Sequence, residues 1–164
     1  MLHLAITRDH FYNSGNTQPL PTPGGHADGV FAVFWSDLDI NPHTYSSVDA
    51  AGANQASGVY VGARTAESGR SGLGRRVTVS YIRVPYCCSG LGPRSTFQYI
   101  LHADGRMVFQ YKELQGPPPA YAALSIGFES GDGRQGAQLS YGWFTRPGDG
   151  SAVEITFRAL QVRF

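Results

Sequence analysis

Hydrophobic and polar side chains alternate with period two in the segment STFQYILHADGRMVFQYKE, residues 95–113. The apolar positions of its two halves each share one face: Phe97, Tyr99, Leu101, Met107, Phe109 and Tyr111. Strict alternation over this length indicates β-strands. Asp104 and Gly105 lie between the halves, and this dipeptide suits a two-residue type I′ turn, whose central residues both need positive φ. The pattern therefore predicts a β-hairpin with a two-residue turn.

Strand patterns recur along the rest of the chain, separated by loops rich in Gly, Pro and Asn. The continuous apolar run at 30–35 is typical of a strand buried on both faces. The other strands are expected at 1–12, 58–65, 75–86, 122–130, 137–144 and 152–164. Alternating strands need a second layer to cover their apolar face. We therefore predict an all-β fold, an antiparallel β-sandwich of about eight or nine strands with long irregular loops.

The composition of the chain supports a single domain over residues 1–164 and excludes some classes of binding partner. Charged residues are 15% of the chain, aromatic residues are 12% and there are 21 glycines, a balance that favours a turn-rich β protein. The net charge of +1 gives no electrostatic basis for binding nucleic acid or an anionic membrane surface. No apolar run approaches the roughly 20 residues that span a bilayer, so we predict no membrane span.

The first residues of the chain, MLHLAITRDHFYN, carry no secretory signal, because they lack a basic leader and a continuous apolar stretch. Leu2, Leu4 and Ile6 instead alternate with polar or small residues, as in a strand. We therefore expect the chain to begin inside a domain, as a fragment of a larger secreted protein. A cytosolic protein that needs no leader is the alternative.

Four segments follow one another in an order that points to a family. They are FAVFWSDLDI, SGVYVG, VTVSYIRVPY with the hairpin, and AALSIGFESGDGRQGAQLSYG. This order resembles the extracellular β-domain of plexin-domain-containing (tumour endothelial marker) proteins and nidogen-like secreted modules. The resemblance covers about residues 30–142, with 143–164 as a closing strand, and the first strands of the family have no counterpart. It implies an extracellular or cell-surface protein that serves adhesion or assembly rather than catalysis.

Two aspartates at the end of the 30–35 run form a candidate metal site. Asp37 and Asp39 are two residues apart, so on a strand their carboxylates point to the same side. With loop carbonyls and Asp49 they would suit calcium. The alternative is that they cap backbone N–H groups of the following turn. A carboxylate-dependent hydrolase would also need a cleft between two carboxylates, which no other feature marks.

The two cysteines, Cys87 and Cys88, are adjacent. They are free thiols, they bridge to cysteines outside the chain, or they form a vicinal disulfide. Metal or redox chemistry is a further alternative, although zinc needs four ligands at regular spacing and a CxxC motif is absent.

Tyr99, Tyr111 and Trp143 are candidates for stacking on a sugar ring, although aromatic residues at alternating strand positions more often belong to a core. No GxSxG or HExxH motif occurs, and we predict no enzymatic activity. The leading hypothesis is a non-catalytic extracellular module that binds other proteins or itself through the loops 13–29, 40–57 and 86–95. An incomplete sandwich would also leave a sheet edge open to strand addition. A carbohydrate-binding module is the alternative.

Overall fold

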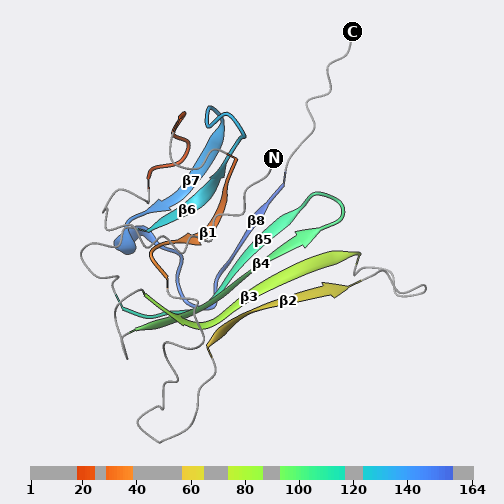
Figure 1. Ribbon diagram of the computed structural model, residues 1–164, viewed down its shortest axis with the longest axis vertical. Helices are drawn as coiled ribbons and strands as arrows, with labels where there is room; N and C mark the ends of the chain where they lie inside the picture. Colours follow the sequence, from red (N-terminus) through yellow and green to blue (C-terminus); the bar gives the residue numbers. More distant parts are fainter. Residues whose placement is uncertain are drawn as a thin grey trace, which may run out of the picture.

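Eight strands form two antiparallel sheets in the computed structural model of the protein (Figure 1). The structure describes residues 18–24, 29–38, 57–64, 74–86, 93–116 and 124–156. The smaller sheet has the order β1-β6-β7 and consists of β1 (Phe31–Trp35), β6 (Ser125–Glu129) and β7 (Gly136–Tyr141). The larger sheet has the order β2-β3-β4-β5-β8 and consists of β2 (Gly58–Arg64), β3 (Arg76–Pro85), β4 (Arg94–His102), β5 (Met107–Leu114) and β8 (Ala152–Ile155).

The predicted all-β sandwich is confirmed, and the predicted strands that fall on described residues are found with small shifts of their ends. A single 3₁₀ turn, Trp143–Thr145, follows β7. In the described parts of the chain no helix is long and apolar enough to cross a membrane. The strand expected at 1–12 and the segment after residue 156 lie outside the described residues.

Aromatic side chains from both sheets fill the space between them. The Tyr81 and Phe97 rings stack with centroids 4.7 Å apart, and the Phe34 ring of β1 lies 4.9 Å from Phe97. The hydroxyl of Tyr111 donates a 2.8 Å hydrogen bond to the carbonyl of Val33, across the two sheets. Because a buried hydroxyl needs a partner, this bond fixes how β5 faces β1.

Strand β1 is buried on both faces, as its continuous apolar sequence predicts. Its second face packs in a smaller cluster of Leu20, Val30, Ala32 and Trp35. The segment 18–24 is held over the smaller sheet by two backbone donors: Leu20 N–H to Gln138 Oε1 at 3.0 Å and Thr22 N–H to Glu129 Oε2 at 2.9 Å. The smaller sheet therefore has its own cover on its outer side.

The turn between β4 and β5 differs from the predicted type I′ turn. The N–H of His102 donates to the Arg106 carbonyl at 2.9 Å, and the N–H of Gly105 donates to the His102 carbonyl at 3.0 Å. Gly105 has a φ of 87°, whereas Arg83 is the one non-glycine residue of the described chain with positive φ. The prediction of a two-residue turn is therefore wrong. The loop has three residues, with a glycine in the left-handed region, and this is the next most common type of hairpin connection.

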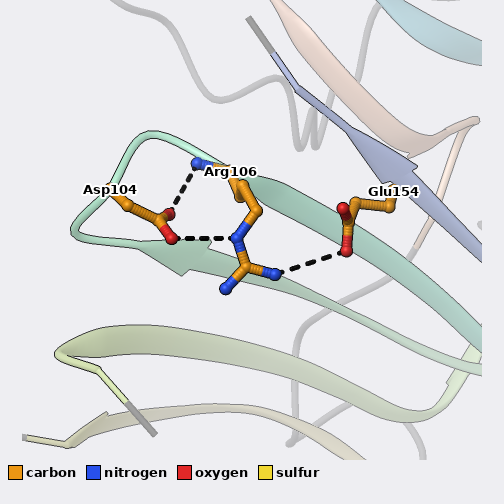
Figure 2. Close-up of polar contacts among 3 residues, drawn as sticks. All are labelled: Asp104, Arg106 and Glu154. Carbon is orange, nitrogen blue, oxygen red and sulfur yellow. Dashed lines mark hydrogen bonds and ion pairs between the residues drawn. The ribbon is translucent and has the colours of Figure 1, made fainter. Parts of the chain in front are cut away.

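A side-chain hydrogen bond accounts for this turn (Figure 2). The Asp104 carboxylate accepts the backbone N–H of Arg106 at 3.0 Å and its Nε–H at 2.9 Å. The Arg106 guanidinium lowers the pKa of Asp104 and reaches Glu154 of β8 at 3.4 Å. Aspartate commonly bonds the backbone two residues on, so Asp104 selects the longer loop while Arg106 links the hairpin to β8.

Two glycines let β6 and β7 approach closely. A Cβ added to Gly127, whose φ is 157°, would lie 2.2 Å from the carbonyl oxygen of Ala137. A Cβ on Gly136 would lie 2.2 Å from the carbonyl oxygen of Phe128. Neither position has room for a side chain without a shift of the backbone, so these glycines are required by the pairing of the two strands.

We expect Gly127→Ala to lower the free energy of unfolding by about 1–3 kcal/mol, the usual cost of overpacking. Gly131→Ala is the matched control, because a Cβ there meets nothing within 4 Å, and it should leave stability unchanged or slightly higher. Urea denaturation of both variants measures the difference. Equal stability of the two variants would contradict the described packing of β6 on β7.

Buried phenols should make the fold sensitive to alkali. Burial raises the pKa of Tyr99 to about 12 and raises the pKa of Tyr81, Tyr86 and Tyr111 further. Above the ordinary value of 10.0 the unfolded chain loses phenol protons that the folded chain keeps, so stability is complete below pH 10 and falls as the pH rises. Urea midpoints between pH 10 and 12 should therefore decrease. Tyr99→Phe should make this decrease shallower, and an unchanged slope would refute the assignment of Tyr99.

Candidate functional site

Strand β2 forms an open edge of the larger sheet. It pairs with β3 over its whole length, from Gly58↔Ile82 to Arg64↔Arg76, and no described strand pairs with its other side. Figure 1 shows β2 at the margin of the larger sheet away from β1, β6 and β7. Every residue of β2 after Gly58 is exposed. Within the described ranges, no strand therefore pairs with the backbone donors and acceptors on that side.

The apolar face of the larger sheet continues onto β2 without a cover. Val59 and Val61 lie opposite Tyr81 and Val79, and directly opposite residues share a face of the sheet. Tyr81 and Val79 are 0% and 7% exposed, whereas Val59 and Val61 are 38% and 71% exposed. The smaller sheet therefore covers the middle of the larger sheet, and no described element covers Val59 and Val61 at the β2 margin.

The start of β2 is fixed by a bulge in β3. The pairing of β3 with β4 shifts between Tyr81 and Val84, and Arg83 within this shift has a φ of 52°. The Ser57 hydroxyl donates to the Arg83 carbonyl at 2.7 Å, and the Arg83 N–H donates to Thr96 Oγ1 at 3.1 Å. These contacts anchor the chain at Ser57, directly before β2, and so hold the start of the edge strand against β3.

A shallow hollow of about 430 Å³ lies at the other end of β2. Its lining residues come from the ends of β2, β3 and β4: Ala63, Arg64, Arg75, Arg76, Val77, Leu101, His102 and Ala103. The lining is mainly apolar and includes three arginines. Among the described residues the ion pairs involve Arg106 alone, so no described carboxylate pairs with Arg64, Arg75 or Arg76.

A second group of exposed apolar side chains lies on β7 and the turn after it. Leu139 and Tyr141 are about two-fifths exposed, and Phe144 is 94% exposed. Trp143 is half-buried against the core, and the Arg146 guanidinium carbon lies 3.8 Å from its ring centroid, in cation–π contact.

The predicted stacking residues do not form a ligand platform. Tyr99 and Tyr111 are 2% and 1% exposed and belong to the core. This corrects their proposed role as stacking residues: their alternating positions face the other sheet, as is usual for such aromatics. Trp143 reaches the surface, but Arg146 occupies a face of its ring.

The predicted metal and thiol residues lie largely beyond the described chain. Asp37 is half-buried just after β1, while Asp39, Asp49, Cys87 and Cys88 fall outside the described residues. Within the described ranges, no three His, Cys, Asp or Glu side chains are close enough together to hold a metal ion. Most of the loops predicted to bind partners also lie outside these ranges. Calcium binding, thiol chemistry and a hydrolase role for the aspartates stay predictions.

Sequence reasoning missed the residues of the open edge. Val59 and Val61 resemble ordinary strand valines, and Arg64, Arg75 and Arg76 lie on either side of a predicted loop. The absence of any charged residue or proline from Gly58 to Ala63 gave no sign of an edge, because edge strands usually carry such protection.

Comparison with known proteins finds no match to the chain: no family model fits its sequence, and no curated protein or solved structure is significantly similar to it. The resemblance to the plexin-domain-containing and nidogen-like domains therefore stays a prediction that rests on the four sequence segments.

The contact of Arg146 with Trp143 gives a direct optical test. We expect Arg146→Gln to increase the quenching of tryptophan fluorescence by acrylamide, because it uncovers the Trp143 ring. Trp35, the other tryptophan, is 2% exposed and should contribute a constant protected fraction. Arg134→Gln, at an exposed turn position, serves as the control and should leave quenching unchanged. Equal quenching in all three proteins would show that the ring is already open to solvent.

Proposed function

We propose that this chain is a non-catalytic β-sandwich module that assembles with other proteins by accepting a strand at β2. The observation that carries this proposal is Val61, which is 71% exposed on an edge strand with no described partner. A valine in this position loses most of the stabilisation that burial would give it. A strand added beside β2 would cover it and also satisfy the backbone groups of the edge.

The composition of β2 supports strand addition as the reason why its apolar residues are exposed. Natural sheet edges are commonly protected by lysine, proline, a bulge or an inward-pointing charge. The sequence GVYVGA of residues 58–63 has no charge and no proline, and its pairing with β3 is regular throughout. An unprotected, regular and anchored edge is the template that β-addition requires.

The proposed location of this module in the cell is based on the sequence alone. The resemblance to extracellular domains supports a role in adhesion or assembly at the cell surface or in an extracellular structure. For the carbohydrate-binding alternative, the burial of Tyr99 and Tyr111 removes two of the three candidate rings. Protein binding is therefore the function that the described surface supports best.

Val61→Lys tests the proposal, because it places a charge on the uncovered row while leaving the core untouched. We expect the wild-type chain isolated from its source to run in a complex larger than the lone chain, and Val61→Lys to run at the mass of the lone chain. Native mass spectrometry or sedimentation measures both, and circular dichroism confirms that the variant is folded.

Leu139→Lys is the matched control, since Leu139 is also an exposed apolar residue of an edge strand, β7. It should leave the complex intact. A complex that survives Val61→Lys and dissociates with Leu139→Lys would move the binding surface to β7 and overturn the proposal.

A further inference from the structure

We infer that the strand accepted at β2 runs antiparallel to it and carries two consecutive acidic residues at its N-terminal end, which meet Arg64, Arg75 and Arg76 beside the hollow. This inference rests on the proposed function and adds to it the chemistry and the direction of the partner.

The charge of the hollow favours an anionic partner. Arg64, Arg75 and Arg76 line one depression, and none of the described carboxylates forms an ion pair with them. The carboxylate of Asp104, in the turn after β4, is engaged by Arg106. Three like charges beside an apolar surface raise the local positive potential, which attracts a complementary anionic segment and repels a cationic one.

The arginines lie on both faces of the sheet, so the added strand needs two adjacent acidic residues to meet them. Arg64 and Arg76 are direct cross-strand partners, so their side chains share a face. Arg75 precedes Arg76 and therefore projects toward the opposite face. Consecutive residues of an added strand also alternate between faces. One acidic side chain would thus meet Arg64 and Arg76, and its neighbour would meet Arg75.

The apolar row of β2 determines the residues that come after the acidic pair in the added strand. Ala63 lies beside the hollow, and Val61 and Val59 occupy alternate positions toward the start of β2. An added strand would place alternate side chains against Val61 and Val59, so the residues at these positions should be apolar. All strand pairs in the described chain are antiparallel. An antiparallel strand beside β2 has its N-terminal end at Arg64, where the hollow lies.

A second copy of the chain fits this surface less well. If two β2 strands paired antiparallel over their full length, Arg64 of each copy would lie opposite Gly58 of the other. Gly58 is next to Ile82 of β3, and Arg83 follows Ile82. Strand β2 carries no acidic residue, so neither arginine cluster would meet a carboxylate on the facing strand. Charge complementarity favours a different, acidic segment.

Three synthetic peptides with blocked ends and a fluorescent label test the inference against the full chain. The first has the sequence Glu-Glu-Thr-Val-Thr-Val-Thr-Val, the second carries the two glutamates at its C-terminal end, and the third replaces them with glutamines. Anisotropy titration should give about tenfold tighter binding for the first peptide than for either of the others, the size expected for a few exposed ion pairs. This preference should be largely lost at about 0.5 M salt, where such pairs are screened.

The protein variants separate the hollow from the edge. Combined Arg64→Gln, Arg75→Gln and Arg76→Gln should remove the preference for the first peptide and leave binding of the glutamine peptide unchanged. Arg134→Gln, an exposed arginine of the turn between β6 and β7, should preserve the preference. Val61→Lys should weaken binding of all three peptides.

Each contrary outcome overturns a distinct statement. Equal binding of the first and second peptides would refute the direction, and a preference that survives the triple variant would refute the arginine hollow. In both cases the edge would still accept a strand, so the proposed function would stand. Peptide binding that is insensitive to Val61→Lys would refute the proposed function itself. A homodimer that Val61→Lys dissociates would identify a second copy as the occupant and overturn the inference.

Discussion

The architecture depends on covering the apolar face of a five-stranded sheet with a sheet of three strands. The hydrogen bond between Tyr111 and Val33 and the bridge between Leu38 and Tyr86 join the two layers. The aromatic core is dense where the layers overlap, as the stacked Tyr81 and Phe97 show. A narrower layer cannot also shield β2, so the valines that continue this apolar row face solvent. The smaller sheet thus stabilises the centre of the larger sheet by burying it, while the apolar side chains of β2 at its margin stay exposed.

The same constraint explains why the margin is ordered enough to bind. Strand β2 pairs along its full length with β3, and Ser57 ties its first residue to the bulge at Arg83. A binding edge that is already in its final conformation does not lose further backbone entropy when a partner arrives. Under the proposed function, stability and recognition are therefore coupled: the contacts that anchor β2 in the fold also prepare the edge that would accept a strand.

Much of the fold could be predicted from the sequence, because period-two alternation is a local property. The hairpin strands, the doubly buried β1 and the pairing of β6 with β7 are visible in this way. The turn at Asp104 and Gly105 was mistaken, since a side-chain bond from Asp104 to Arg106 overrides the dipeptide preference. Alternation also cannot reveal how wide the opposing layer is. It therefore gave Tyr111 and Val61 the same apolar character, although one is buried and the other is bare.

Hydrogen exchange at the backbone amides of β2 would show whether this edge accepts a strand. It should be measured in the chain alone and in the complex isolated from its source, because exchange reports which edge amides acquire a hydrogen-bond partner. We predict slower exchange across residues 58–64 in the complex, with little change at residues 136–141 of β7. Unchanged exchange at β2 together with new protection at β7 would contradict strand addition at β2, and would place the contact on the opposite margin of the molecule.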